Sequence, residues 1–374
     1  MEKSKVYYSD MRIYDRKSNL LMKLEKLIRT AGISNIDFKD KFCAIKIHFG
    51  EPGNLAFLRP NYAKVVADIV KSLGGKPFLT DCNTLYVGRR KNALEHMDSA
   101  YENGFSPMST GCQIIIADGL KGTDETLVDI DGDLVKQAKI GTAIMDSDIF
   151  ISLSHFKGHE EAGFGGALKN IGMGCGSRAG KMEMHSDGKP KTDKTKCVGC
   201  KGCEAICAHN AISFDENRKA SIDVDKCVGC GRCIGACNFN AIAPIWNSAN
   251  DDMNRKIAEY SYAVIKDKPN FHISLVIDVS PFCDCHWEND TAIIPDVGMF
   301  ASFDPVALDV ACADACNKQK PLENSLLGEN LRKGGECCGD HFHATSPATN
   351  WRSCVEHAQK LGLGNMEYEL IEVK

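Results

Sequence analysis

The sequence lacks both a strong excess of one charge and any long apolar run. Its 45 lysines and arginines nearly balance 50 aspartates and glutamates, and the net charge of −5 gives no basis for binding nucleic acid or an anionic membrane. The longest uncharged stretch, residues 233–250, contains four asparagines and a proline, so no segment is expected to span a bilayer. The N-terminal residues lack the apolar region of a secretory signal, so we expect a cytoplasmic protein.

A glycine fingerprint for dinucleotides is also missing after the first predicted strand, so no dependence on NAD is predicted. The content of 43% hydrophobic and 25% charged residues is ordinary for a globular chain and excludes extensive disorder. A length of 374 residues exceeds what one compact core usually holds, which predicts two or three folding units.

Cysteine is the residue that the chain has in excess. Nineteen cysteines are present, and eight of them lie between residues 197 and 237. A long chain without a secretory signal is not expected to be a disulfide scaffold, so these thiols stay available as metal ligands. The cysteine content therefore indicates iron–sulfur or zinc chemistry.

The cysteine-rich segment is an internal repeat of thirty residues. The sequence KCVGCKGCEAICAHNAI, which starts at Lys196, returns as KCVGCGRCIGACNFNAI, which starts at Lys226. Two copies are too few to build a solenoid, so we expect a pseudo-twofold module wrapped around metal. We predict a body formed by residues 1–188 and 247–374, with residues 189–246 as a ferredoxin-like insert.

Each copy of the repeat has the C-x2-C-x2-C-x3-C spacing of bacterial two-cluster ferredoxins, although the proline that usually follows the last cysteine is missing. Three closely spaced cysteines would bind one [4Fe–4S] cluster, and the fourth would reach the other cluster. Two zinc sites are the alternative, but zinc ribbons use paired CxxC knuckles without this third cysteine. The predicted ligands are Cys197, Cys200, Cys203 and Cys237 for the first cluster, and Cys227, Cys230, Cys233 and Cys207 for the second.

Strand and helix patterns alternate on both sides of the insert, which predicts an α/β body with a mainly parallel sheet. A helix over 304–317 would begin with Asp304 as its N-cap and Pro305 in its first turn. The other expected helices cover 62–73 and 253–266, and the expected strands cover 42–49, 77–81, 114–117, 149–156 and 272–279.

A glycine-rich segment over 154–185 follows the fourth of these strands and contains several basic residues and histidines. Glycine allows close approach of the backbone, and free amides at a helix start can hold an anion. His159 or His155 would serve as proton donor, with Lys169 as a further catalytic residue; the alternative is a close-packed loop with solvated lysines. The residues predicted to bind an anionic organic cofactor or substrate are Gly163, Gly165, Gly166, Lys169, Arg178 and His185.

Other candidates lie at strand ends and among the remaining cysteines. Lys46 and His48 would face the same side of their strand, and Asp81 ends the next one, so these three side chains are candidates for the opposite wall of a cleft. Cys283 and Cys285, in a CDCH sequence after an apolar strand, are candidates for a third metal or cluster site together with Cys175, or are simply reduced thiols near the cleft. The vicinal pair Cys337 and Cys338 is either a further metal site or part of an exposed loop.

The motifs FKGHEEAGFGGALKNIGMGC, ADGLKGTDET, DCNTLYVGRR and PFCDCHWEND resemble a widespread family of uncharacterised iron–sulfur-centre proteins, which often carry a bacterial-type ferredoxin. The resemblance covers nearly the whole chain. It implies a cytoplasmic redox protein, mostly of anaerobes, and supplies no substrate.

A weaker resemblance connects residues 159–174 with the lactate racemase family that uses a nickel-pincer nucleotide. It implies a catalytic role for His159, a covalent tether to the cofactor at Lys169 and a nickel ligand at His185. Residues 167–168 and Met173 depart from that family's usual residues.

Together these features predict an iron–sulfur oxidoreductase that passes electrons through two [4Fe–4S] clusters to an anionic substrate or cofactor. Its partner would be an electron-donating or electron-accepting protein or small molecule. The alternatives are a racemase-like proton-transfer enzyme and a non-enzymatic electron carrier or metal-cluster scaffold.

Overall fold

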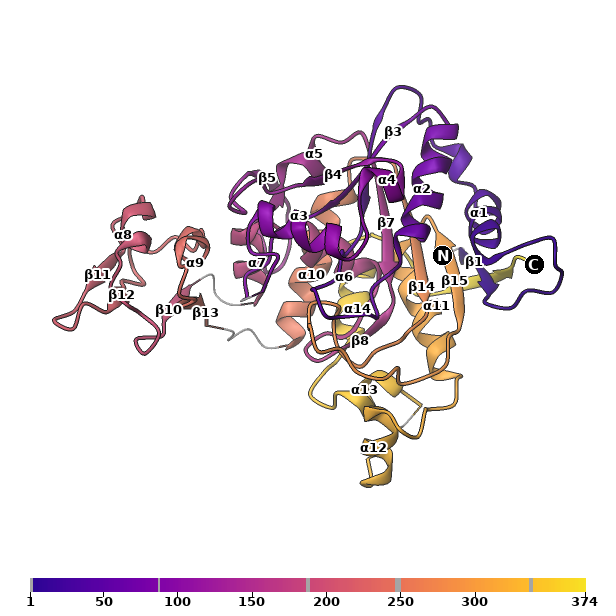
Figure 1. Ribbon diagram of the computed structural model, residues 1–374. Helices are drawn as coiled ribbons and strands as arrows, with labels where there is room; N and C mark the ends of the chain where they lie inside the picture. Colours follow the sequence, from indigo (N-terminus) through magenta and orange to yellow (C-terminus); the bar gives the residue numbers. More distant parts are fainter. Residues whose placement is uncertain (1–2, 87, 186–188, 246–249, 336–338) are drawn as a thin grey trace.

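An eight-stranded sheet runs through the larger part of the molecule in the computed structural model (Figure 1). The structure describes residues 3–86, 88–185, 189–245, 250–335 and 339–374. In spatial order the strands are β16 (Tyr368–Glu372), β1 (Ser4–Asp10), β15 (Gly298–Ser302), β14 (Asn270–Val276), β7 (Ile149–His155), β2 (Phe42–Lys46), β3 (Lys76–Asp81) and β4 (Gln113–Ile116).

Most of this sheet is parallel. The five neighbouring strands from β14 to β4 run parallel, whereas β15 is antiparallel to both of its neighbours. Every residue of β7 is buried, as expected for a parallel strand that is covered on both faces. The predicted α/β class with a mainly parallel sheet is confirmed, and strands from before and after the cysteine-rich segment pair within it, with β7 beside β14.

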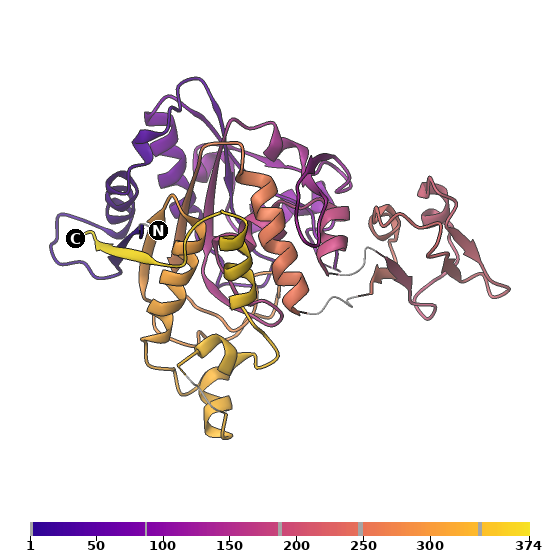
Figure 2. The ribbon, with the colours of Figure 1, turned by 180° about the vertical axis from the view of Figure 1, so that it is seen from behind.

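Helices cover both faces of the sheet (Figure 2). Successive residues of β7 point to opposite faces, so Phe150 belongs to one apolar core while Ile151 belongs to the other. The core around Ile151 is closed by α1 (Leu20–Thr30) and α2 (Pro60–Ser72). The core around Phe150 is closed by α6 (Ala167–Cys175), α10 (Asn250–Ile265), α11 (Pro305–Asn317) and α14 (Arg352–Lys360).

The elements expected from the sequence are confirmed as β2, β3, β4, β7, β14, α2, α10 and α11. Asp304 caps α11 as predicted, because its side chain accepts hydrogen bonds from the amides of Val306 and Ala307. The first predicted strand ends earlier than expected, at Lys46. The chain turns after it, where the Gly50 amide donates to Nδ1 of His48 and Gly50 has a φ of +80°.

The remaining elements of the body are short or lie at its edges. No helix within the described ranges is long and apolar enough to cross a membrane. The predicted Cys337–Cys338 site lies outside the described residues. The remaining elements of the body are the 3-10 helix Ile33–Asn35, α3 (Ala93–Glu102), α4 (Pro107–Thr110), β5 (Glu125–Asp129), β6 (Gln137–Gly141), α5 (Thr142–Met145), β8 (Lys157–His159), β9 (Gly163–Gly165), α7 (Arg178–His185), α12 (Leu326–Arg332) and α13 (His341–Thr345).

The cysteine-rich segment forms a smaller unit at one side of the body (Figure 1). Its two repeats share backbone conformation, since Lys201 and Gly231, thirty residues apart, both have φ near +65° directly before a short helix. Its first and last strands pair antiparallel, with Thr192 opposite Ile242. Its elements are β10 (Pro190–Thr192), α8 (Gly202–Ile206), β11 (Ile212–Phe214), β12 (Ala220–Ile222), α9 (Arg232–Ala236) and β13 (Ile242–Pro244).

Candidate functional site

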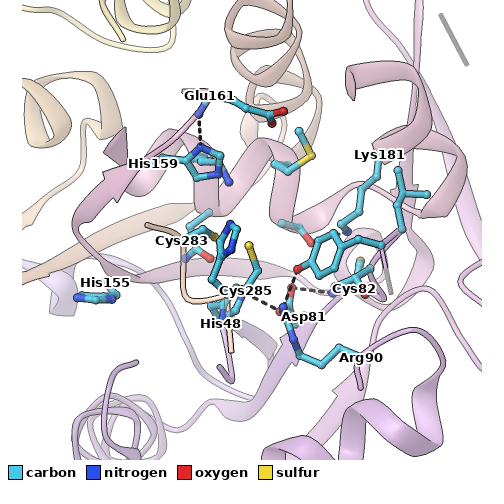
Figure 3. A pocket seen from close by; sticks show the side chains of 18 of the residues that line it. His48, Asp81, Cys82, Arg90, His155, His159, Glu161, Lys181, Cys283 and Cys285 are labelled. Carbon is cyan, nitrogen blue, oxygen red and sulfur yellow. Dashed lines mark hydrogen bonds and ion pairs between the residues drawn. The ribbon is translucent and has the colours of Figure 1, made fainter. Parts of the chain in front are cut away.

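A cavity of about 460 Å³ opens beyond the carboxyl ends of β2, β3 and β7 (Figure 3). This is the place where open parallel sheets usually bind ligands. The structure brings most of the predicted site residues together there, although they come from widely separated parts of the chain. The predicted residues that line it are Lys46, His48, Asp81, His155, His159, Lys169, His185, Cys283 and Cys285.

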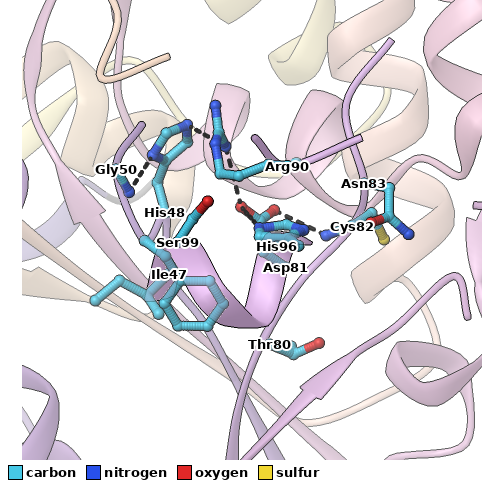
Figure 4. Close-up of polar contacts among 12 residues, drawn as sticks. Ile47, His48, Gly50, Thr80, Asp81, Cys82, Asn83, Arg90, His96 and Ser99 are labelled. Carbon is cyan, nitrogen blue, oxygen red and sulfur yellow. Dashed lines mark hydrogen bonds and ion pairs between the residues drawn. The ribbon is translucent and has the colours of Figure 1, made fainter. Parts of the chain in front are cut away.

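One wall of the cavity is a buried network of matched charges (Figure 4). Nζ of Lys46 lies 2.9 Å from a carboxylate oxygen of Asp81, and it also donates to the Asn170 side chain at 2.8 Å. Burial opposes ionisation of Asp81, but the Lys46 charge lowers the carboxyl pKa well below its usual range. Because each charge already has a partner, this wall is rigid rather than available for a ligand.

Arg90 extends the same network, and sequence reasoning did not identify it. Its guanidinium donates to Glu51 at 2.8 Å and lies 2.9 Å from Nε2 of His48. Burial and the neighbouring Arg90 charge lower the pKa of His48 to about 3, so the ring is neutral. The missed signal is the pair of arginines at residues 89 and 90, after β3, because a buried arginine needs an acidic partner such as Glu51.

Lys169 differs from the other cations of the cavity. Nζ of Lys181 donates to the carbonyl of Gly176 at 2.6 Å, and Nζ of Lys157 lies 3.7 Å from Asp284. Within the described parts of the chain, half-buried Lys169 makes no hydrogen bond or ion pair. Its charge is therefore the one most open to an incoming anion.

The start of α6 is not open to an anion, in contrast to the expectation from the glycine-rich segment. The buried carboxylate of Asp309 accepts hydrogen bonds from the amides of Ala167 and Leu168, at 2.6 and 2.9 Å. Burial raises the pKa of Asp309 to about 7. The helix N-terminus is thus satisfied from within the fold.

The three glycines predicted to bind a cofactor serve close packing instead. Gly163 and Gly165 belong to β9, which pairs with β8, and Gly163 has a φ of +88° with Trp351 packed against it. Asp309 lies where a side chain at Gly166 would have to be. None of these glycines lines the cavity described here.

His159 and His155 have different surroundings, which distinguishes the two candidate proton donors. Both ring nitrogens of His155 face acceptors, Nδ1 at 2.8 Å from Asp284 and Nε2 at 2.8 Å from the carbonyl of Ile277. Nδ1 of His159 accepts from the amides of Glu161 and Ala162, both at 3.1 Å, which places the ring proton on Nε2. His159 lines the cavity and lowers the pKa of Cys283, so it is the candidate proton donor directed at the cavity.

Cys283 and Cys285 lie in a turn closed by a hydrogen bond from the amide of His286 to the carbonyl of Cys283, at 2.9 Å. Both side chains line the cavity and are neighbours in Figure 3. The neighbouring Cys285 thiol lowers the pKa of Cys283 despite its burial, and the Lys169 charge and His159 add to the effect. The neighbouring Cys283 and burial raise the pKa of Cys285.

Two other predicted residues lie away from the cavity. Cys175 is buried, and its carbonyl accepts from the thiol of Cys82 at 3.3 Å. Arg178 is fully buried and donates through Nε to the carbonyl of Lys121 at 3.0 Å. His185 lines the cavity, and burial together with the Lys169 charge lowers its pKa to about 3.

Arg178 and Met182 of α7 contact the insert, while Lys181 and His185, which lie on the same face of this helix, line the cavity. A side chain at Gly231 would meet Cγ of Arg178 at 2.9 Å, so the start of α9 packs directly on this arginine. The insert and the cavity therefore meet along one face of α7.

The eight cysteines of the insert surround two small apolar cavities. The cavities are lined by Cys197, Cys200, Cys203 and Cys237, and by Cys207, Cys227, Cys230 and Cys233. Backbone amides donate to three of the sulfurs, as from Ala241 to Cys237 at 3.2 Å. In the part of the chain that is described, no three His, Cys, Asp or Glu side chains converge as the ligands of a single metal ion.

Comparisons with known proteins give similarity over different lengths. The thylakoid-associated protein sll1697 of Synechocystis is 28% identical over 124 residues, which is 33% of this chain and 35% of that protein. The alignment thus spans about a third of the curated relative. The lactate racemase apoprotein of Thermoanaerobacterium thermosaccharolyticum matches 74% of this chain and 51% of its own, with 12% identity and a TM-score of 0.37.

A structural-genomics protein of Thermotoga maritima matches 68% of this chain and 49% of its own, with 12% identity and a TM-score of 0.35. A family model described as a domain of unknown function matches residues 43–314, which include the cavity residues from Lys46 to Cys285 and the whole insert. The chain therefore belongs to the DUF362 family.

Proposed function

We propose that this protein is an iron–sulfur oxidoreductase. In this proposal residues 189–246 are a two-cluster ferredoxin-like module, and the body of residues 1–188 and 247–374 binds an anionic substrate or cofactor in its cavity. The observation that carries the proposal is the sorting of the eight cysteines into two cavities, because each set of four is the crossed set expected for ferredoxin ligation.

The surroundings of the cysteines fit such clusters. A single zinc ion holds its sulfur ligands at about 2.3 Å, whereas these cysteines border a cavity without converging on one point in the described chain. Amides that donate to cysteine sulfur, such as Ala220 to Cys197 at 3.3 Å, are the kind of contact that tunes a cluster's potential. When bound, two [4Fe–4S] clusters would supply one-electron transfer.

The position of α7 supports a functional connection between the insert and the cavity. Arg178 contacts the insert at Gly231 and Gly235, and Lys181, one turn later on the same face of α7, lines the cavity. Side chains three residues apart on a helix are neighbours, with Cβ atoms about 5–6 Å apart. The insert thus lies close to the site along this face, which suits direct delivery of electrons.

Two residues of the cavity have defined roles in this proposal. Lys169 would hold an anionic group of the ligand, since it makes no ion pair within the described residues. His159 would donate a proton from Nε2, because both backbone amides that fix its orientation bind Nδ1.

The first test is the metal content of anaerobically purified protein. About eight irons per chain are expected, four for each of two clusters. Cys200→Ser should lower that number, whereas the matched control Cys112→Ser, which changes a buried cysteine of the body, should keep it. Stoichiometric zinc in place of iron would refute the proposal.

The second test concerns the ligand. If Lys169 contributes one charge-assisted hydrogen bond, Lys169→Met should weaken binding of an anionic ligand by about 10- to 150-fold. The iron content and visible spectrum of this variant should match those of the wild type.

A proton-transfer enzyme is the second candidate, because His159, Lys169 and His185 line one cavity. In that case Lys169 would carry a covalent cofactor. Mass spectrometry of the peptide that contains Lys169, combined with nickel analysis, distinguishes the two functions.

A further inference from the structure

We propose that Cys283 and Cys285 form a redox-active dithiol in the cavity, which reduces a small anionic disulfide and becomes an internal disulfide. The dithiol chemistry depends on the residues of the cavity and not on the insert. Only the return of electrons from the insert rests on the proposed function.

The arrangement of the two side chains carries this inference. They lie one residue apart in a turn closed by the hydrogen bond from the His286 amide to the Cys283 carbonyl, and they are neighbours in Figure 3. Disulfide formation requires two cysteines that are close in space, and such a turn keeps the two backbones close together. Both cysteines line the cavity, so a bound molecule can reach them.

His159 prepares Cys283 as the attacking sulfur. Its Nδ1 is held by two backbone amides, so Nε2 keeps the proton. His159 and Lys169 both lower the pKa of Cys283, which favours its thiolate, the nucleophilic form of cysteine.

Other cysteines of the body lack this environment. Burial raises the pKa of Cys43, Cys175 and Cys354, as it does that of other core cysteines, so they remain neutral thiols. Cys283 is equally buried, yet its pKa moves in the opposite direction because of its neighbours.

The charges near the pair define the class of substrate. Lys169 acts on both sulfurs and has no ion-pair partner among the described residues, and buried Lys157 adds a second positive charge. A carboxylate attached to the substrate would be held by Lys169 beside the reacting sulfur. The expected ligand is therefore a small disulfide that carries negative charge.

The reaction balances as follows. The Cys283 thiolate attacks one sulfur of the substrate, forms a mixed disulfide and expels one substrate thiolate, which takes the proton of Cys285. The Cys285 thiolate then attacks Cys283, forms the internal disulfide and expels the second substrate half as a thiolate. Two electrons and one proton restore the starting pair, and the reductant is the iron–sulfur insert or an added dithiol.

The test uses the full chain with its clusters, under anaerobic conditions, and dithiobis(nitrobenzoate), a dianionic disulfide that releases a coloured thiolate. The wild type should release two equivalents in a fast phase. The peptide that contains Cys283 and Cys285 should then be two hydrogens lighter by mass spectrometry. Cys285→Ser should release one equivalent and keep a mixed disulfide at Cys283, and the matched control Cys354→Ser should behave as the wild type.

The neutral dithiodipyridine tests the preference for negative charge. Lys169→Met should slow the reaction with the dianionic disulfide by about 10-fold more than the reaction with the neutral one, because only the former loses its ion pair as well as the effect of Lys169 on Cys283. The inference is overturned if Cys283 stays unmodified. It is also overturned if Cys283 and Cys285 both react with the reagent while no internal disulfide forms between them.

A last measurement separates this inference from the proposed function. After oxidation, dithionite should regenerate the dithiol faster in the wild type than in Cys200→Ser. If two equivalents are released in a fast phase but both proteins regenerate the dithiol at the same rate, the dithiol is supported and electron delivery from the insert is refuted. If the iron content is intact but no fast phase occurs, the dithiol is refuted and the proposed iron–sulfur function is unaffected.

Discussion

The body and the insert differ in what holds each of them together. The body has two large apolar cores, one on each face of its sheet, with fully buried aromatic residues such as Phe150 and Phe271. The insert has one small core, in which a few side chains such as Ile212 and Ile234 pack among cysteines. Its strands are only three residues long.

This contrast has a physical consequence. Hydrophobic burial scales with the apolar area removed from water, so the body is stable through its own packing. Small units with little core usually need metals or disulfides for their stability. We therefore expect the body to fold without ligands and the insert to depend on the groups that its cysteines bind.

If the insert holds the proposed [4Fe–4S] clusters, the largest expected effect comes from removing their iron with an oxidant and a chelator. The insert should then lose its fold completely, because its core cannot offset the loss of chain entropy. Limited trypsin digestion should cut within residues 189–245 and leave the body intact. Resistance of the insert without iron would abolish the contrast between the two regions.

A substitution in the body core should have the next largest effect. Phe150 is fully buried, and Phe150→Ala should lower the free energy of unfolding by about 3–5 kcal/mol. Urea titration monitored by the fluorescence of Trp287 and Trp351 measures the change. The matched control is Phe214→Ala in the insert, where the side chain is half-buried and the body should be unaffected.

Acid should weaken the body through buried histidines. Burial lowers the pKa of His272 to about 3, against about 6.5 in an unfolded chain. The unfolded state therefore binds more protons, and stability falls as the pH drops below 6.5. Between pH 7 and pH 5 the wild type should lose about 2 kcal/mol more than His272→Gln.

Unfolding titrations in urea at both pH values measure this difference. His209→Gln, which changes an exposed histidine of the insert, provides the control. Equal slopes for His272→Gln and the wild type would show that this histidine has the same pKa in the folded and unfolded states.

The smallest effect is expected at the contact between the two regions. Nζ of Lys91 donates to the carbonyl of Cys237 at 3.0 Å and to the side chain of Asn240 at 2.8 Å. Lys91→Met should weaken this contact by about 1 kcal/mol, or about fivefold. Hydrogen exchange at the amides near Ala241 reports it, with exposed Lys121→Met as the control.

The parts that could be predicted from the sequence are those encoded by neighbouring residues. The strands β2, β3 and β7 carry strong apolar runs, so their positions were predicted. Strand β16 was missed because it lies at the sheet edge, half exposed, and has no such pattern. The cavity wall of His48 and Asp81 followed from their places at strand ends, whereas Arg90 comes from a loop with no periodic signal.

The start of α6 shows the limit of local reasoning. A helix that begins among glycines has free amides as far as the sequence shows. Asp309, which satisfies these amides, is more than a hundred residues away and reaches them only because α11 packs beside α6. Similarly, the sequence placed Cys283 at a strand end but contained no sign of its contact with His159.

The pairing of β10 with β13 suits replacement of the insert by another domain. The chain enters and leaves the insert on two adjacent strands, with Pro190 opposite Pro244, so the insert begins and ends at one two-stranded stem. A foreign domain whose ends lie equally close could be grafted onto this stem without altering the eight-stranded sheet. Such grafts would have to reproduce the surface that meets Arg178, Met182 and Lys91.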